Sequence, residues 1–144
     1  MLISQILKDK PTQGVLTVVP GTTVGAAANI LSDKRIGGLI VSQDGVHPLG
    51  IITERDIVRE LGRRGSVCLE DKVDDMMTTA LVTCGPGDRA IKVLQVMTEH
   101  RFRHMPVVDG DEMVGLVSIG DVVKARLDEL GSQAEALKNM IMGY

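Results

Sequence analysis

The sequence predicts an α+β fold made of two tandem βαββα repeats that pack sheet to sheet with pseudo-twofold symmetry. Two observations support this fold class. First, equivalent residues recur at a constant spacing: Pro20 and Pro86 are 66 positions apart, and so are Arg35 and Arg101. Second, the apolar pattern in each half changes from the period of a helix to that of paired strands. A repeat of this kind indicates two copies of one structural unit.

Each copy is expected to begin with a short strand and an amphipathic helix. Pro20-Gly21-Thr22 and Pro86-Gly87-Asp88 are turn sequences of the kind that precede a helix. Behind each turn, apolar residues recur at the i, i+3, i+4, i+7 spacing of one helix face. These residues are Val24, Ala27, Ala28 and Leu31 in the first copy and Ala90, Val93, Leu94 and Met97 in the second.

A hairpin and a second helix are expected next in each copy. Apolar runs at 39–41 and 105–108 lead into Asp-Gly turns, which predict hairpins. The returning arms continue into two related segments, GIITERD from Gly50 and GLVSIGD from Gly115. We expect the second helix of each copy to start within these segments.

The repeats divide the chain into three parts. We assign residues 1–66 to the first repeat, 67–128 to the second and 129–144 to an additional C-terminal helix. Residues 62–75, which include the basic sequence Arg63-Arg64-Gly65, are expected to form a charged, solvated connector. A unit of about 60 residues buries only about 60% of its unfolded surface, so the two copies should fold together, with a cleft along the pseudo-twofold axis.

Composition excludes several classes of function. Phe102 and Tyr144 are the only aromatic residues and the formal net charge is -3, which disfavours nucleic acid as a partner. The sequence has no apolar run near 18 residues, so we expect no membrane insertion. Cys68 and Cys84 stand alone without a zinc-binding spacing. We therefore expect reduced thiols and a cytoplasmic protein.

Both copies contain the pattern G-h-h-T/S-x-x-D, where h is apolar. It is formed by Gly50, Thr53 and Asp56 in the first copy and by Gly115, Ser118 and Asp121 in the second. One interpretation is a helix cap, because a hydroxyl residue followed three positions later by an acidic one forms a capping box. The other is a ligand site, because a helix N-terminus favours anions and a carboxylate can accept hydrogen bonds from both hydroxyls of a ribose.

With two copies of this motif in register, the chain resembles the cystathionine β-synthase (CBS) domain pair, or Bateman module, over residues 1 to about 128. The resemblance implies a regulatory module that binds AMP, ADP, ATP, NAD or S-adenosylmethionine in the cleft between the repeats and signals to a partner protein. It also implies a role for each matching residue. Asp56 and Asp121 would hold ribose, with Thr53 and Ser118 near ribose or phosphate. The adenine-facing positions would be Thr17, Val18, Leu39, Thr83, Cys84 and Met105, which are also candidate core residues.

The two copies differ in their basic residues. The resemblance implies that Arg103 and His104 reach the phosphate of a ligand held by the other repeat, so that they and Arg55 would converge on the site of Asp56. The alternative is that this basic segment is a solvated edge. Lys8 and Lys10 could also neutralise phosphate, or be ordinary exposed lysines. His100 and His104 have the i, i+4 spacing of a metal pair, but a helix-to-strand boundary separates them, and we expect no metal.

The C-terminal segment carries an apolar face formed by Leu130, Ala134, Leu137 and Ile141. Contact between two copies of the chain would cover it, so we expect a homodimer. A catalytic function is not expected, because the sequence offers no nucleophile with a base, no phosphate-binding loop and no metal cluster. Two functions stay open: a sensor of adenine nucleotides, and a structural or interaction module in which both motifs only cap helices.

Overall fold

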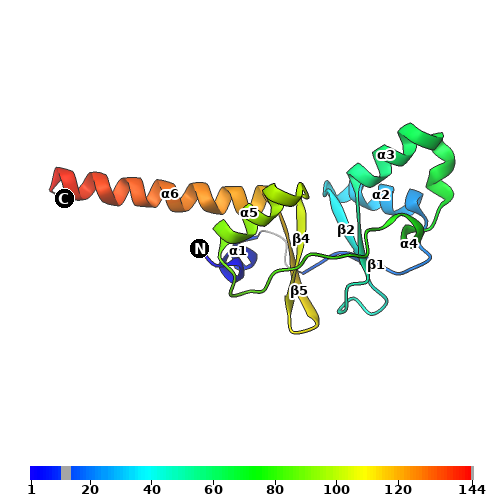
Figure 1. Ribbon diagram of the computed structural model, residues 1–144, viewed down its shortest axis with the longest axis horizontal. Helices are drawn as coiled ribbons and strands as arrows, with labels where there is room; N and C mark the ends of the chain where they lie inside the picture. The colour runs from blue at the N-terminus through cyan, green and yellow to red at the C-terminus, as the bar shows by residue number, and fades with distance from the viewer. Residues whose placement is uncertain (11–13, 144) are drawn as a thin grey trace. The chain divides into compact units, whose positions relative to one another are not determined.

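The first repeat is built on a three-stranded sheet in the computed structural model, which describes residues 1–10 and 14–143. Strand β1 (Thr17–Val18) pairs in parallel with β2 (Gly38–Val41), which pairs antiparallel with β3 (Gly50–Thr53) (Figure 1). Helices α2 (Val24–Lys34) and α3 (Glu54–Arg64) complete the predicted order. Their apolar faces pack on one face of the sheet, in a core of Val18, Val24, Ala27, Leu31, Leu39, Val41, Ile52, Ile57 and Val73.

The second repeat has the same order of elements, with one strand reduced. Helix α5 (Ala90–His100) precedes the antiparallel pair β4 (His104–Asp109) and β5 (Glu112–Ser118), and α6 (Ile119–Met142) follows. In place of the expected strand at Thr83-Cys84, Cys84 forms an isolated parallel bridge with Val107. Its core contains Ile3, Ile6, Cys84, Ala90, Val93, Met97, Met105, Val107, Val117, Val122 and Ala125.

The register of the strands confirms the repeat. Val18 pairs with Val41 in the first copy, and Cys84 pairs with Val107 in the second. Both members of the second pair lie 66 positions after their counterparts, which is the spacing predicted from the sequence. The predicted α+β fold of two related units is therefore confirmed.

Each repeat is completed by a short helix from outside its βαββα segment. Helix α1 (Ile3–Asp9) joins the second repeat, where Ala90 N–H donates to the Met1 carbonyl at 2.9 Å and Ile3 N–H donates to the Asp88 carbonyl at 2.9 Å. Helix α4 (Val73–Met76) joins the first repeat by the equivalent bonds, Val24 N–H to Asp71 and Val73 N–H to Thr22, both at 2.8 Å. One unit thus contains residues 1–10, 83–108 and 115–143, and the other contains 14–82 and the hairpin tip 109–114.

Two sequence-based expectations are wrong in detail. Residues 62–75 are largely exposed, as expected, but they are not an irregular connector: α3 continues to Arg64, a 3₁₀ helix η1 (Gly65–Glu70) follows, and Cys68 is fully buried. Arg63 and Arg64 pair with Glu60, and Arg64 also pairs with Asp71, so this basic sequence is a helix end and not a loop. The charged residues had indicated a connector. However, Arg63 and Arg64 form ion pairs with Glu60 at helical spacing, and such pairs stabilise a helix.

The second difference concerns the C-terminal segment. Residues 129–142 do not form a separate helix, because α6 runs without interruption from Ile119 to Met142; Tyr144, the last residue of the predicted helix, lies outside the described residues. Gly131 therefore lies within the helix, and the left-handed residue that ends the helix is Gly143. Figure 1 shows the second half of α6 extending away from the other elements of its unit. In the described part of the chain, no helix is both long and apolar enough to cross a membrane.

Candidate functional site

The two G-h-h-T/S-x-x-D motifs form the same structure, a complete capping box at a strand-to-helix junction. In the second repeat, Ser118 N–H donates to Asp121 Oδ2 at 2.9 Å, and Asp121 N–H donates to Ser118 Oγ at 3.1 Å. In the first, Thr53 N–H donates to Asp56 Oδ2 at 2.9 Å, and Asp56 N–H donates to Thr53 Oγ1 at 3.3 Å. The predicted cap therefore exists in both copies, and it fixes both carboxylates in the first turn of a helix.

Other side chains pack closely over the glycine of each motif. A Cβ atom at Gly50 would lie 2.5 Å from Met77 Sδ and 3.0 Å from the Thr78 carbonyl oxygen. At Gly115 it would lie 2.6 Å from Leu7 Cδ2. Leu7 belongs to α1 and Met77 directly follows α4, the two short helices that complete the repeats. The glycines thus let equivalent side chains cover β3 and β5 at the point where each strand leads toward its capping box.

The two carboxylates have different basic partners. Asp56 Oδ1 accepts a hydrogen bond of 2.9 Å from Arg59 Nη2, one turn later on the same helix. Asp121 Oδ2 lies 3.0 Å from Lys10 Nζ, which also donates to the Leu116 carbonyl at 2.9 Å. The structure thus brings the predicted residues Lys10 and Asp121 together. The Arg59 contact was missed by the sequence analysis, although its i, i+3 spacing from Asp56 is a signal that could have predicted it.

Lys10 also influences the ionisation of Asp121. Partial burial raises the pKa of this carboxyl, but the hydrogen bond from Ser118 N–H and the adjacent Lys10 ammonium lower it by more. The net result is a pKa below the ordinary value for aspartate. Asp121 is therefore an anion at neutral pH that accepts hydrogen bonds.

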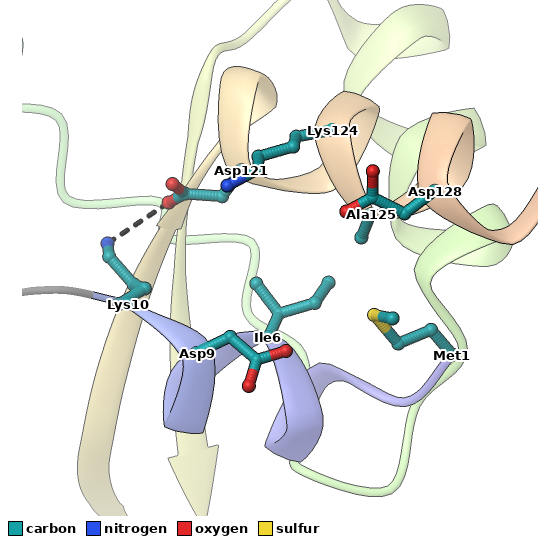
Figure 2. A pocket seen from close by; sticks show the side chains of 8 residues that line it. All are labelled: Met1, Ile6, Asp9, Lys10, Asp121, Lys124, Ala125 and Asp128. Carbon is teal, nitrogen blue, oxygen red and sulfur yellow. Dashed lines mark ion pairs between the residues drawn. The ribbon is translucent and has the colours of Figure 1, made fainter. Parts of the chain in front are cut away.

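A hollow of about 300 Å³ lies beside this carboxylate, between α1 and α6. Figure 2 shows Lys10, at the end of α1, pointing to Asp121 in the first turn of α6. The hollow is lined by Met1, Ile6, Asp9, Lys10, Asp121, Lys124, Ala125 and Asp128. It combines apolar atoms with charges of both signs.

The other predicted basic residues are divided between the two units. Arg55 is exposed in the first turn of α3, in the unit of Asp56, whereas Arg103 and half-buried His104 lie in the unit of Asp121. The Arg103 carbonyl accepts a hydrogen bond of 2.8 Å from Ile119 N–H, at the start of α6. The predicted convergence of these groups on Asp56 stays a prediction.

The predicted adenine-facing residues differ in exposure. Leu39 and Met105 are completely or almost completely buried in their own cores, and Val18 and Cys84 are buried as well. Burial raises the pKa of the Cys84 thiol to about 12, so this cysteine is a core residue in its thiol form. Only half-buried Thr17 and exposed Thr83 are open to solvent among these six positions.

Of the remaining candidates, Lys8 is exposed on α1, and His100 lies at the end of α5. The His100 ring stacks on Phe102 with the ring centroids 5.9 Å apart. Arg101, between them, adopts the left-handed conformation that ends the helix.

Comparisons with known proteins agree with this geometry. The family model described as CBS domain matches residues 3–63 and 73–128. The chain is 34% identical to the CBS domain-containing protein CBSX3, mitochondrial, of Arabidopsis thaliana, over 98% of this chain and 72% of the relative. It is 32% identical to the CBS domain-containing protein YhcV of Bacillus subtilis, over 93% and 94% of the two chains.

Solved structures give the same result. The CBS-domain containing protein ATU1752 from Agrobacterium tumefaciens superposes with a TM-score of 0.82 at 36% identity, over 88% of this chain and 99% of that chain. The CBS domain protein NE2398 superposes with a TM-score of 0.80 at 30% identity, over 88% and 98%. A match to the inosine-5'-monophosphate dehydrogenase of Methanocaldococcus jannaschii spans only 22% of that enzyme. The sequence, the fold and these comparisons together show that the chain belongs to the CBS domain family and contains two CBS repeats.

Proposed function

We propose that this CBS pair is a regulatory module that binds an adenosine-containing ligand through Asp56 and Asp121 and transmits the binding to a partner protein. The candidate ligands are AMP, ADP, ATP, NAD and S-adenosylmethionine, bound in the cleft that we expect between the repeats. The observation that carries the proposal is the pair of equivalent carboxylates, each fixed in the first turn of a helix. No catalytic step is part of the proposal.

The contacts of each carboxylate are compatible with ribose binding. Ser118 N–H and Lys10 Nζ both contact Oδ2 of the Asp121 carboxylate, and we propose that Oδ1 takes a ribose hydroxyl. Asp56 Oδ1 is held by the exposed side chain of Arg59, and an exposed ion pair of this kind contributes only about 0.2–1 kcal/mol. A ribose diol can displace it at little cost.

Charge around the hollow bears on which ligand binds near Asp121. Lys10 and Lys124 supply two positive charges, while Asp9, Asp121 and Asp128 supply three negative ones. This balance gives a triphosphate no net attraction within the hollow, whose lining residues all belong to the unit of Asp121. The CBS pair of protein MJ0100, solved with 5'-methylthioadenosine and S-adenosyl-L-methionine, shares the fold at 23% identity and a TM-score of 0.77. We therefore include both compounds among the probes.

A structural module is the second candidate function, and one observation favours it. Both capping boxes are complete without any ligand, so helix stability alone accounts for the hydroxyl and acidic residues of the motifs. In that case the geometry shared by the two motifs would serve packing, and the partner would contact a protein surface that no nucleotide alters.

Thermal unfolding with a panel of ligands separates the two candidates. The panel contains adenosine, AMP, ADP, ATP, NAD, S-adenosylmethionine and 5'-methylthioadenosine. A ligand at 100 times its dissociation constant stabilises the folded state by about 2.7 kcal/mol. At about 3 °C per kcal/mol the midpoint should rise by about 8 °C. If no compound changes the midpoint, the structural module is the better account.

The assembly and location of the protein complete the proposal. We propose a homodimer, because α6 exposes apolar side chains such as Leu137 and Ile141. We also propose a cytoplasmic location, because Cys68 and Cys84 are free and buried, as expected in a reducing compartment.

A further inference from the structure

Helix α6 carries an apolar stripe with the spacing of a coiled coil. Along this helix, apolar residues recur at intervals of four, three, four, three and four positions. They are Val123, Leu127, Leu130, Ala134, Leu137 and Ile141. This is the a and d pattern of a heptad repeat. It adds Val123 and Leu127 to the apolar face predicted from the sequence. Because α6 is one continuous helix, all six residues lie along one side of it.

The stripe is not part of the core of its own unit. Leu127, Leu137 and Ile141 are 63%, 58% and 76% exposed. The residues that α6 buries lie on another face, where Val122 is 0% and Ala125 is 5% exposed. The ion pair between the Met1 amino group and Glu129, at 2.8 Å, helps to hold that face toward α1. The stripe is therefore left open to solvent along the length of the helix.

We propose that the α6 helices of two copies of this chain form a parallel, in-register, two-stranded coiled coil through this stripe. A second copy is the occupant that fits, because a seam with a period of 3.5 residues packs best against another helix with the same period. A flat surface or a short groove would contact only part of the stripe.

Charge favours the parallel orientation. The e and g positions beside the stripe include Lys124, Arg126, Gln133 and Lys138. In a parallel in-register pair, Arg126 lies opposite the partner's Gly131, and Gln133 lies opposite the partner's Lys138, so no like charges meet. In an antiparallel pair with matched ends, Lys124 lies opposite the partner's Lys138, and like charges there are unfavourable.

Cysteine cross-linking tests both the surface and the orientation. In the parallel pair the two copies of residue 137 face each other at a d position, so Leu137→Cys should form a covalent dimer under mild oxidation. Glu135→Cys, at an outward b position of the same helix turn, is the matched control and should stay monomeric on a denaturing gel. The native cysteines Cys68 and Cys84 are buried and should not interfere.

Two further samples make the proposal falsifiable. Leu137→Glu should shift the dimer to monomer in light scattering, with the dissociation constant raised at least about tenfold, and circular dichroism should show an unchanged fold. Cross-linking in a mixture of Leu127→Cys and Leu137→Cys, without cross-linking of Leu137→Cys alone, would show an antiparallel pair and overturn the orientation. A Leu137→Glu protein that remains a dimer would overturn the coiled coil itself. These outcomes do not depend on whether a nucleotide binds.

Discussion

Lys10 Nζ lies 3.0 Å from Asp121 Oδ2, which links the end of the first helix to the capping box of the last one. The same Asp121 oxygen accepts the Ser118 N–H that closes the box. One carboxylate oxygen thus joins a local motif to a segment far away in the sequence. The pair is the main difference between the two otherwise equivalent motifs, because Asp56 pairs with Arg59 on its own helix.

The acid dependence of stability should report this pair. The pKa of Asp121 is below its ordinary value, so its ionised form stabilises the fold above about pH 4, and that contribution is lost as the pH falls further. We expect Lys10→Met to lower the free energy of unfolding by about 1 kcal/mol at pH 7. The difference from the parent should shrink toward pH 3. Urea unfolding at both pH values checks this, with Lys92→Met on α5 as a control for removing an exposed lysine.

If Lys10→Met and Lys92→Met change stability equally at both pH values, Lys10 does not stabilise the Asp121 anion. The other acidic groups titrate in all three proteins, so their contributions cancel in the comparison.

Two arginines end helices in a backbone conformation that favours glycine. Arg35 has φ 54° after α2, and Arg101 has φ 60° after α5. A side chain in this region costs about 1–2 kcal/mol, whereas glycine adopts it readily. We expect Arg35→Gly to stabilise the protein by about 0.5–1 kcal/mol, measured as a higher urea midpoint. Lys34→Gly, at the last position of the helix, should instead destabilise the protein by up to about 1 kcal/mol; equal effects of the two variants would contradict the argument.

Packing at the motif glycines gives a third prediction. Gly50→Ala should destabilise the protein by about 1–3 kcal/mol, because the added Cβ meets Met77 and the Thr78 carbonyl. Gly115→Ala should cost less, because it meets only the flexible end of Leu7. Gly62→Ala is the control: nothing lies within 4 Å of the new Cβ, and the helix should gain up to about 1 kcal/mol. If thermal unfolding shows that Gly50→Ala is as stable as Gly62→Ala, close packing does not explain the glycine at position 50.

A fourth prediction concerns phosphate recognition under the proposed function. Arg103→Ala should weaken AMP binding at the Asp56 site by about 1–3 kcal/mol and leave adenosine binding nearly unchanged, because adenosine has no phosphate for the guanidinium to pair with. Calorimetry with both ligands and both proteins distinguishes the outcomes. If Arg103→Ala loses the same affinity for both ligands, Arg103 stabilises the fold and does not contact phosphate. If it loses affinity for neither, the Arg103 side chain lies in solvent.

The repeat, its register and both capping boxes could be predicted from the sequence because each depends on short, fixed spacings. The Lys10–Asp121 contact could not, because no local pattern relates two residues so far apart. For the same reason the sequence did not reveal that α1 packs in the second repeat. Leu2-Ile3 there and Lys72-Val73 in the first repeat occupy equivalent places. The ordered segment after α3 was missed because its charged residues suggested a solvated loop. In the structure Arg64 instead forms ion pairs with Glu60 and Asp71.

Titration of the parent and of the Asp56→Asn and Asp121→Asn variants with the tightest ligand of the panel tests the central claim most directly. Asp56 and Asp121 are the N3 residues of their capping boxes, and the side-chain oxygen of asparagine can also accept the N-cap N–H, so a capping role alone would tolerate the change. If the carboxylates hold ribose, each variant should bind more weakly by about 1.5–3 kcal/mol at its site, which is the contribution of a hydrogen bond to a charged group. Equal affinities in the parent and both variants would contradict the ribose role and leave the motifs as helix caps.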